Sequence, residues 1–212
     1  MTAMPPAEKF TVAALAERIR AMATRSRRTV IGITGAPGAG KSTVAEALVR
    51  ELGPAAVLVP MDGFHLSNQV LESLGRRGRK GAPDTFDAAG YIALLRRLRE
   101  PGADIVYAPT FRRDIEESIG SSIPVPPQTP IVITEGNYLL LDAHPWQQVR
   151  GLLDAVWYLQ LDDKVRVQRL VARHMDFNKT AEEARAWAEG TDQRNADAVV
   201  ASAHHADLVV RL

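Results

Sequence analysis

Gly35-Ala36-Pro37-Gly38-Ala39-Gly40-Lys41-Ser42, followed by Thr43, is the stretch that decides the fold of this chain. It fits the pattern G-x-x-x-x-G-K-[ST] of a phosphate-binding loop. Residues 29–34 before it are β-branched and apolar, as in a buried parallel strand, and residues 41–51 after it have helical periodicity. Strand, glycine loop and helix form the context that the motif requires. A glycine-rich turn without chemistry is the weaker interpretation, because the lysine and the serine are both in place.

The loop's chemistry follows from its backbone. Glycine at positions 35 and 40 permits backbone angles and close approaches that a Cβ would block. The N–H groups and the helix N-terminus then point to one place, which attracts phosphate. The Lys41 ammonium can reach the β- and γ-phosphates, and the Ser42 hydroxyl can ligate Mg²⁺. The motif therefore predicts a site for a nucleoside triphosphate, ATP by our reading, with Mg²⁺.

Composition limits the remaining possibilities. The chain has 212 residues, 46% apolar and 24% charged, with a formal net charge of +1 and no cysteine. We therefore expect one globular domain over residues 1–212, without disulfides or thiolate metal sites, and a cytoplasmic location. The near-neutral charge argues against a nucleic-acid partner, and the absence of a long apolar run argues against a membrane span. The first residues also lack a signal-peptide layout.

Two predicted strands end in an acid. Residues 55–61 form an apolar segment that ends at Asp62, and residues 131–135 form another that ends at Glu135. In open α/β sheets, ligands bind beyond the carboxyl ends of the strands, so Asp62 is a candidate catalytic carboxylate. The alternative is a turn aspartate before Gly63. Glu135 has the position of a Walker-B acid, which engages Mg²⁺ directly or through water.

An arginine-rich helix follows the predicted strand at 155–161. It starts near Asp163 and carries Arg166, Arg169 and Arg173, whose spacings of three and four place them on one face. A solvated face is one interpretation. The other is a lid that closes over the triphosphate, because the planar guanidinium stabilises charge on a transferring phosphoryl group.

A second region is expected to cover the substrate. Residues 75–83 form a basic glycine-rich loop, either a mobile solvated loop or a flap that meets an anionic ligand. Residues 104–108 predict a short strand, and residues 115–128 predict an excursion or small hairpin. We expect residues from about 75 to about 128 to act as an insertion near the active face.

The complete pattern alternates strands with helices. Five core strands are predicted, at 29–34, 55–61, 131–135, 155–161 and 206–210. Helices are predicted at 8–23, 41–51, 68–74, 88–99, 181–189 and 192–203, in addition to the arginine helix. This order predicts a doubly wound α/β fold.

The ordered motifs resemble a known superfamily. After the phosphate loop come Asp-Gly-Phe-His at 62–65, Pro-Asp-Thr-Phe-Asp at 83–87, Ile-Thr-Glu-Gly-Asn-Tyr at 133–138 and the arginine helix. This order resembles the uridine kinase, bacterial pantothenate kinase and phosphoribulokinase superfamily, and especially a branch named nucleoside/nucleotide kinase or fructose-transport kinase. The resemblance implies a three-layer P-loop fold with helices on both faces, strand order 2-3-1-4-5, and a helical lid over about 163–190.

The resemblance also implies residue roles. Asp62 matches the acid that takes the proton from the acceptor hydroxyl, and Asp84 matches an acid that uridine kinases use on ribose. Ser42 and Glu135 match the metal residues. The catalytic set would be Asp62, Lys41, Arg169 and Arg173. The nucleotide would contact Gly35, Ala36, Pro37, Gly38, Ala39, Gly40, Lys41, Ser42, Thr43 and Arg166. The acceptor would contact Asp62, Phe64, His65, Asp84, Phe111, Arg113, Glu135 and Asn137.

The acceptor's identity stays open. Uridine kinases carry Tyr-Asp-Phe and then a histidine where this chain has Pro-Thr-Phe-Arg-Arg at 109–113 and Glu116. We expect an ATP-dependent kinase for a hydroxyl of a sugar, nucleoside or pantothenate-like metabolite, possible as a homodimer. A nucleoside-monophosphate-type kinase, with Arg113 on the acceptor phosphate, is the alternative. A GTPase switch is weaker because Asn178-Lys179-Thr180-Ala181 lacks the final acid, and a nucleic-acid-linked ATPase has only the basic loop in its favour.

Overall fold

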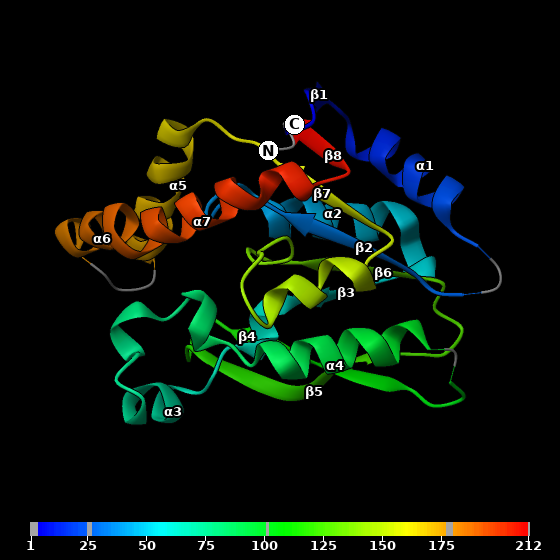
Figure 1. Cartoon of the computed structure of the whole chain (residues 1–212), viewed down its shortest axis with the longest axis horizontal. Coiled ribbons are helices and arrows are strands. Elements are labelled where there is room, and N and C mark those ends of the chain that lie inside the picture. The colour runs from blue at the N-terminus through cyan, green and yellow to red at the C-terminus, as the bar shows by residue number, and fades with distance from the viewer. Residues whose placement is uncertain (1–3, 25–26, 101, 177–179, 212) are drawn as a thin grey trace.

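A parallel sheet of six strands forms the centre of the protein (Figure 1). The computed structural model describes residues 4–24, 27–100, 102–176 and 180–211. The strand order is β1-β8-β7-β2-β6-β3, and all neighbouring pairs are parallel. The strands are β1 (Ala7–Lys9), β2 (Thr29–Thr34), β3 (Ala56–Pro60), β6 (Ile131–Glu135), β7 (Ala155–Leu159) and β8 (Leu208–Arg211).

The predicted order of the five core strands is confirmed, since 2-3-1-4-5 corresponds to β3-β6-β2-β7-β8. Two predictions are wrong: the central sheet has six strands instead of five, and the first helix does not start at Glu8. Residues 7–9 form a sixth strand that pairs with the edge of β8, from Ala7 opposite Val209 to Lys9 opposite Arg211. Helix α1 (Val12–Met22) starts later, where the Thr11 side chain accepts a hydrogen bond from the Ala14 N–H. Pairing with a distant strand leaves no local sequence pattern.

Helices cover both faces of the sheet, which gives the three layers expected. Alternate residues of β2 face opposite sides, so Val30 and Ile31 belong to different hydrophobic clusters. The Ile31 side is covered by α1 and α2 (Lys41–Leu52), which contribute Leu15 and Leu48. The Val30 side is covered by α4 (Ala88–Arg99) and α7 (Gln193–Ser202). No helix in the described part of the chain is long and apolar enough to cross a membrane.

The remaining elements include the predicted excursion and the arginine helix. The predicted excursion is an antiparallel hairpin of β4 (Val106–Arg112) and β5 (Glu117–Val125), separate from the central sheet. The arginine helix is α5 (Asp163–Asp176). Helix α6 (Ala181–Trp187) continues through a π-helical turn, Ala188–Asp192, into α7. Helix α3 (Asn68–Ser73) precedes the basic loop.

Asp154 joins three segments at the opposite end of the sheet. Its Oδ2 accepts a hydrogen bond of 2.8 Å from the Val30 N–H at the start of β2. Its Oδ1 lies 2.5 Å from Nη1 of Arg27 and 3.3 Å from Nη1 of Arg99. Burial works to raise the pKa of this carboxyl, but the Val30 hydrogen bond and the two arginines outweigh it and hold the pKa below its ordinary value.

The variant Asp154→Asn should therefore lower the free energy of unfolding by about 1–3 kcal/mol at pH 7. A depressed pKa gives stability that is complete above the unfolded pKa and disappears as pH falls through the folded one. The difference in the free energy of unfolding between wild type and variant should stay constant above about pH 5 and become smaller below about pH 4. Urea unfolding followed by circular dichroism at several pH values measures it. Asp197→Asn, an exposed aspartate on α7, is the control, and a gap that does not change with pH would contradict the assignment.

Candidate active site

The carboxyl ends of β2, β3 and β6 meet at one cavity. β6 pairs with both other strands, with Glu135 opposite Ile33 on one side and Pro60 on the other. The phosphate loop follows β2, and the 3₁₀ turn η2 (Met61–Phe64) follows β3. The topology thus brings together a lysine, a hydroxyl and two acids from distant parts of the sequence. The cavity measures about 570 Å³, and its lining includes Lys41, Ser42, Asp62 and Glu135.

Lys41 is buried in the phosphate loop, where its ammonium contacts backbone carbonyls. Nζ donates hydrogen bonds of 2.9 Å to the Gly35 carbonyl and 3.1 Å to the Ala36 carbonyl. Burial lowers the pKa of Lys41 to about 8, and the nearby Glu135 and Asp62 oppose this shift. The ammonium therefore carries its charge at neutral pH at the bottom of the loop, where a phosphate would meet it.

Ser42 and Glu135 lie in contact. The Ser42 hydroxyl donates a 3.1 Å hydrogen bond to Oε1 of Glu135. Burial raises the pKa of Glu135 to about 7, and the negative charge of Asp62 adds to the effect. A hydroxyl and a carboxylate side by side form an oxygen set of the kind that Mg²⁺ accepts, and the raised pKa reflects a carboxylate short of positive charge. These residues fit the metal that the sequence implies.

Asp62 faces the same cavity from η2. Its Oδ2 lies 3.0 Å from Nη2 of Arg113, at the tip of the β4–β5 hairpin. Burial works to raise the pKa of Asp62, but the positive charges of Arg113, Lys41 and Arg173 outweigh it, so the pKa stays below its ordinary value. η2 lies so close to β4 that a Cβ added at Gly63 would be 2.4 Å from the Pro109 carbonyl oxygen. Any side chain at position 63 would push Asp62 out of place.

An aromatic stack holds His65. Its Nδ1 donates a 2.8 Å hydrogen bond to the Asp62 carbonyl, which requires the hydrogen on Nδ1. The ring lies between Phe86 at 4.0 Å and Phe111 at 4.6 Å, measured between centroids. The Lys80 ammonium lies over the ring of Phe111, 5.0 Å from its centroid, which is a cation–π contact. Burial lowers the pKa of His65, so the ring is neutral and supports the η2 turn.

The arginines of α5 differ from one another. Arg169 and Arg173 line a second cavity of about 260 Å³ with the phosphate-loop residues Gly40, Ser42 and Thr43. Arg173 also lines the larger cavity, and burial lowers its pKa, with Arg113 adding to the effect. These two side chains therefore face the position of a bound triphosphate.

Arg166 holds the phosphate loop from behind. Its side chain is 1% exposed, and its guanidinium bonds the Pro37 carbonyl at 3.4 Å and Oε1 of Gln193 at 2.6 Å. The helix backbone lies so close that a Cβ at Gly38 would be 2.9 Å from the Arg166 carbonyl oxygen. The guanidinium is thus fully engaged by protein groups and does not line either cavity, unlike its expected role as a nucleotide contact.

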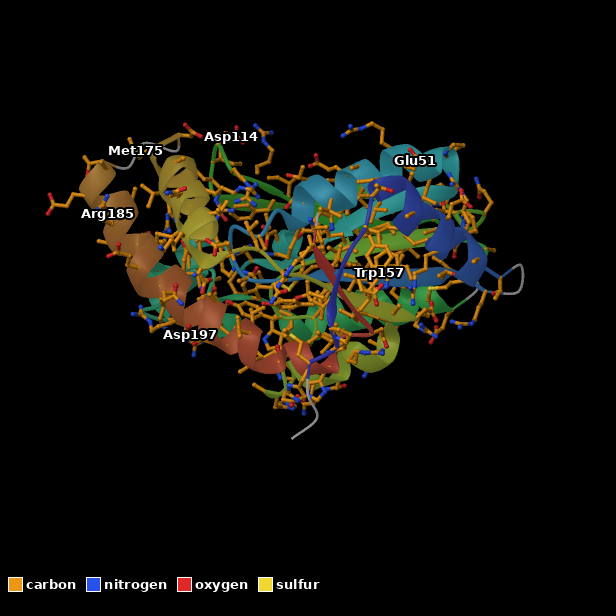
Figure 2. The ribbon with its side chains drawn as sticks, turned by 90° about the horizontal axis from the view of Figure 1, so that it is seen from above. Glu51, Asp114, Trp157, Met175, Arg185 and Asp197 are labelled. Atoms are coloured by element: carbon orange, nitrogen blue, oxygen red, sulfur yellow. The ribbon has the colours of Figure 1, made fainter. Side chains whose placement is uncertain are left out.

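The tip of the hairpin and the end of α5 border the same cavity. Asp114 at the hairpin tip and Met175 near the end of α5 lie at the same end of the molecule (Figure 2). Asp114 and Asp176 both line the larger cavity. The two regions expected to act as substrate cover and lid therefore border the same space.

Two expected substrate residues lie outside the cavity. Phe64 packs edge-on against Tyr91 in the hydrophobic core, with centroids 5.2 Å apart. Asp84 forms ion pairs with Arg79 and, at 3.4 Å, with Arg76, within the basic loop. The other expected acceptor contacts, His65, Phe111, Arg113 and Asn137, do line it.

Sequence reasoning missed several lining residues. Lys80 belongs to the basic loop, for which the sequence leaves open both a solvated loop and a flap that meets an anionic ligand. It is buried and donates hydrogen bonds to Oδ1 of Asn68, at 2.7 Å, and to the Glu116 carbonyl. His174 Nε2 lies 2.7 Å from Oδ2 of Asp192 and joins α5 to the π-helical turn. No motif marks His174, and the basic loop does not single out Lys80. Phe86, Trp187 and Asn195 also line the cavity.

Comparisons with known proteins agree with this arrangement. Residues 31–188 match a family model described as "AAA domain". The chain is 35% identical to the "Putative uridine kinase C227.14" of Schizosaccharomyces pombe, over 80% of this chain and 75% of that one. It is 34% identical to the "Uncharacterized protein YggC" of Escherichia coli, over 88% and 78%. A crystal structure of a "putative fructose transport system kinase" from Silicibacter sp. TM1040 superposes with TM-score 0.87 at 37% identity, over 94% of this chain and 98% of that one.

The alternative of a GTPase switch receives no support from the fold. Its guanine-reading string begins at Asn178 and Lys179, which lie outside the described residues, and Thr180 caps α6 instead of following a strand.

Replacing Glu135 tests the electrostatics of the site. The pKa of Glu135 in the folded protein is about 7, above the ordinary value of about 4.3. Ionisation of this carboxyl therefore destabilises the folded state. The destabilisation is absent at low pH and reaches its full size above the folded pKa. At pH 8, the free energy of unfolding of Glu135→Gln should therefore be about 2–4 kcal/mol higher than that of the wild type. This difference should become smaller as the pH falls toward 4. Urea titrations without nucleotide measure this difference. Glu46→Gln, which changes an exposed glutamate, is the control. A Glu135→Gln variant less stable than wild type at pH 8 would refute the raised pKa.

Proposed function

The chain belongs to the AAA domain family of P-loop proteins, within the superfamily of uridine and pantothenate kinases, and on this basis we propose that it is an ATP-dependent kinase that phosphorylates a hydroxyl of a small metabolite. The observation that carries the proposal is the position of Asp62. It faces the phosphate loop across one cavity with Lys41, and its salt bridge to Arg113 lies within the site.

The donor side is made of positive charge and backbone amides. Phosphoryl transfer depends mainly on positioning and charge stabilisation. Lys41 would contact the phosphates from the bottom of the loop, and Arg169 and Arg173 would contact them from α5. Arg166 contributes indirectly, since it fixes the loop carbonyl at Pro37. Ser42 and Glu135 would hold Mg²⁺, which neutralises charge on the triphosphate when bound.

The acceptor side is organised around Asp62. Because its pKa is held below the ordinary value, the carboxylate is ionised at neutral pH and can accept a hydrogen bond from an acceptor hydroxyl. It would orient the hydroxyl oxygen toward the γ-phosphorus and receive the proton as the new O–P bond forms and the bond from the γ-phosphorus to the bridging oxygen of ADP breaks. His65 positions Asp62 through the hydrogen bond from its Nδ1 to the backbone carbonyl of Asp62. A cavity of about 570 Å³ is suited to a small metabolite.

The two covering segments would complete the site. We propose that residues 163–190 act as a lid and residues 75–128 as a substrate cover, in one domain of residues 1–212. Closure would exclude water from the triphosphate and limit ATP hydrolysis. We also propose that the protein acts in the cytoplasm and forms a homodimer. Light scattering measures the molar mass in solution and so tests the dimer.

Asp62→Asn should reduce kcat roughly 10²- to 10⁴-fold while the KM for ATP stays close to the wild-type value, because the amide keeps the shape and loses the base. A screen of ATP consumption over nucleosides, pantothenate, ketohexoses and their phosphates identifies the acceptor first. Asp104→Asn, an exposed aspartate remote from the cavity, is the matched control. The kinase proposal fails if no hydroxyl compound raises ATP turnover of the wild type above that of Asp62→Asn.

A second candidate is a kinase for acceptors that already carry an anionic group. Arg77 and Lys80 line the acceptor side of the cavity, beside Arg113. The Lys80 and Arg113 side chains have protein partners, at Asn68 and Asp62, whereas the Arg77 side chain makes no hydrogen bond or ion pair within the described part of the chain. This cation therefore favours a phosphorylated or carboxylated acceptor, as in nucleoside-monophosphate-type kinases.

Arg77→Gln tests the charge of the acceptor. For an anionic acceptor, the variant should raise KM roughly 5- to 30-fold with a small change in kcat, the size of one charged hydrogen bond. For an uncharged acceptor, KM should not change. Steady-state kinetics on a phosphorylated compound and its unphosphorylated form separate the two. Arg79→Gln is the matched control, since Arg79 lies in the same loop but pairs with Asp84 outside the cavity.

A further inference from the structure

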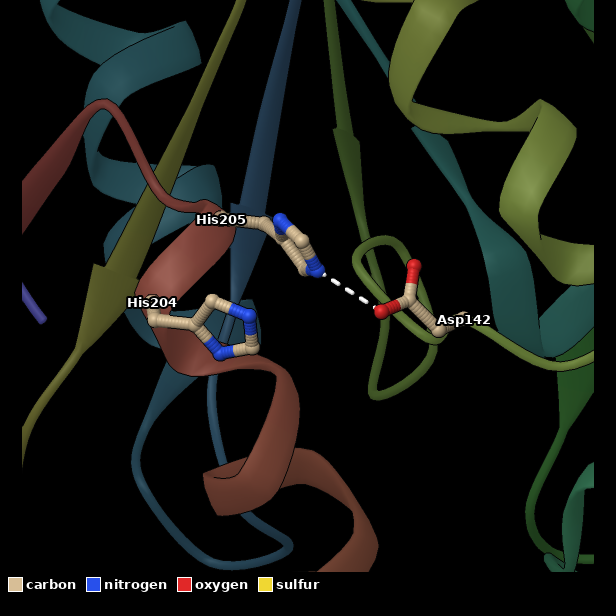
Figure 3. Close-up of side chains that lie close together, drawn as sticks. All are labelled: Asp142, His204 and His205. Carbon is tan, nitrogen blue, oxygen red and sulfur yellow. Dashed lines mark hydrogen bonds and ion pairs between the residues drawn. The ribbon is translucent and has the colours of Figure 1, made fainter. Parts of the chain in front are cut away.

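Two histidines and an aspartate meet on a face of the protein that the proposed kinase activity does not use. His204 and His205 lie in the 3₁₀ turn η8 (Ala203–His205), between α7 and β8. Asp142 lies in the loop that follows β6. All three side chains point toward one another across the gap between these segments (Figure 3). None of them lines the cavity at the phosphate loop.

The three side chains have the spacing of a ligand set. One ligand atom from each lies within 4.8 Å of the other two. His205 Nε2 is 2.8 Å from Oδ2 of Asp142, and the two imidazole centroids are 3.9 Å apart at an interplanar angle of 39°. Ligand atoms at about 2.0–2.2 Å from one zinc ion are about 3 Å apart, so small side-chain rotations suffice to admit an ion.

His204 is oriented for ligation. Its Nδ1 donates a 2.9 Å hydrogen bond to the Ala201 carbonyl. This bond places the ring hydrogen on Nδ1 and leaves the Nε2 lone pair available. A backbone carbonyl bound to the distal nitrogen is the usual support of a metal-bound histidine.

The backbone on both sides of the cluster is anchored in the core. Ala203 and Ala206, which flank the histidines, are 1% and 7% exposed. Leu139 and Leu140, shortly before Asp142, are buried in the same hydrophobic cluster. The two segments therefore hold their side chains at a fixed separation without any ion, so binding costs little ordering.

We propose that Asp142, His204 and His205 bind a divalent transition-metal cation of the zinc type. A simple His205–Asp142 ion pair accounts for one imidazole and leaves the second, stacked on it, without a role. Two imidazoles and one carboxylate prefer Zn²⁺, Ni²⁺ or Cu²⁺ over Mg²⁺.

The bound ion would act as a clamp. The side chains of His205 and Asp142 are 37% and 73% exposed, so water can fill the remaining coordination positions. The ion would replace the hydrogen in the contact between His205 and Asp142, and that proton would leave to solvent. It would tie the loop after β6 to the connection between α7 and β8, in addition to the backbone pairing of the sheet.

Calorimetric titration of the full chain with ZnCl₂, with saturating Mg²⁺ to occupy the Ser42–Glu135 site, tests the proposal. We expect one equivalent of zinc to bind the wild type in the micromolar range. His204→Ala and Asp142→Asn should each weaken that binding by at least tenfold, and should abolish the rise in Tm that zinc gives the wild type. His144→Ala, which removes another exposed imidazole from the same loop, is the matched control and should keep both.

Proton NMR of the imidazole groups provides a second measurement that does not depend on affinity. Zinc should shift the ring signals of His204 and His205 and leave those of His65 and His174 in place. Tm values without metal show whether each variant folds. Equal zinc affinity and stoichiometry in wild type and His204→Ala, or the same loss in His144→Ala, would overturn the proposal. Kinase activity is not a readout here, so its failure would leave this result standing.

Discussion

The whole site depends on charge balance in a space with little water. Lys41 and the two acids at the ends of β3 and β6 lie around one cavity, and none of these charges is stable there alone. Burial lowers the pKa of Lys41 and raises that of Glu135, while Asp62 keeps its charge because Arg113, Lys41 and Arg173 lie around it. One acid is thus held ionised, and the other is held close to protonation. The proposed magnesium triphosphate would bring positive charge next to Glu135 and negative charge next to Lys41, so its binding would stabilise the charged form of both groups.

The geometry that maintains this balance comes from tight backbone contacts. Helix α5 reaches the phosphate loop at Gly38, and η2 reaches β4 at Gly63, in both cases closer than a side chain permits. Arg166 then fills the space behind the loop, where its guanidinium bonds Pro37, Asp163 and Gln193. A buried arginine with three protein partners is a structural support. It explains why three arginines with helical spacing have different surroundings, although the sequence presents them alike.

Local patterns were sufficient for most of the fold. The phosphate loop and the alternation of strands with helices follow from motifs and periodicity, and the strand order follows from the family resemblance; the structure contains all three. Strand β1 was missed because its three residues are specified by their partner β8 and not by their own pattern. Similarly, Asp84 stands in a recognisable motif but pairs with arginines of its own loop, and Lys80 looks solvated but is buried under the hairpin. Side-chain destinations in loops depend on packing partners far away in the sequence.

The β4–β5 hairpin is anchored in the core near its open end and contacts η2 and Lys80 nearer its tip. Ala108 and Val125, near its open end, are fully buried in the core, whereas its tip carries Arg113 to Asp62. The anchoring residues and the residues proposed to touch an acceptor therefore lie in different parts of the same hairpin. Evolution can exchange the tip, in length or in charge, without disturbing the phosphate loop or the sheet. A lineage built on this scaffold can diversify its acceptors while it inherits the donor machinery intact.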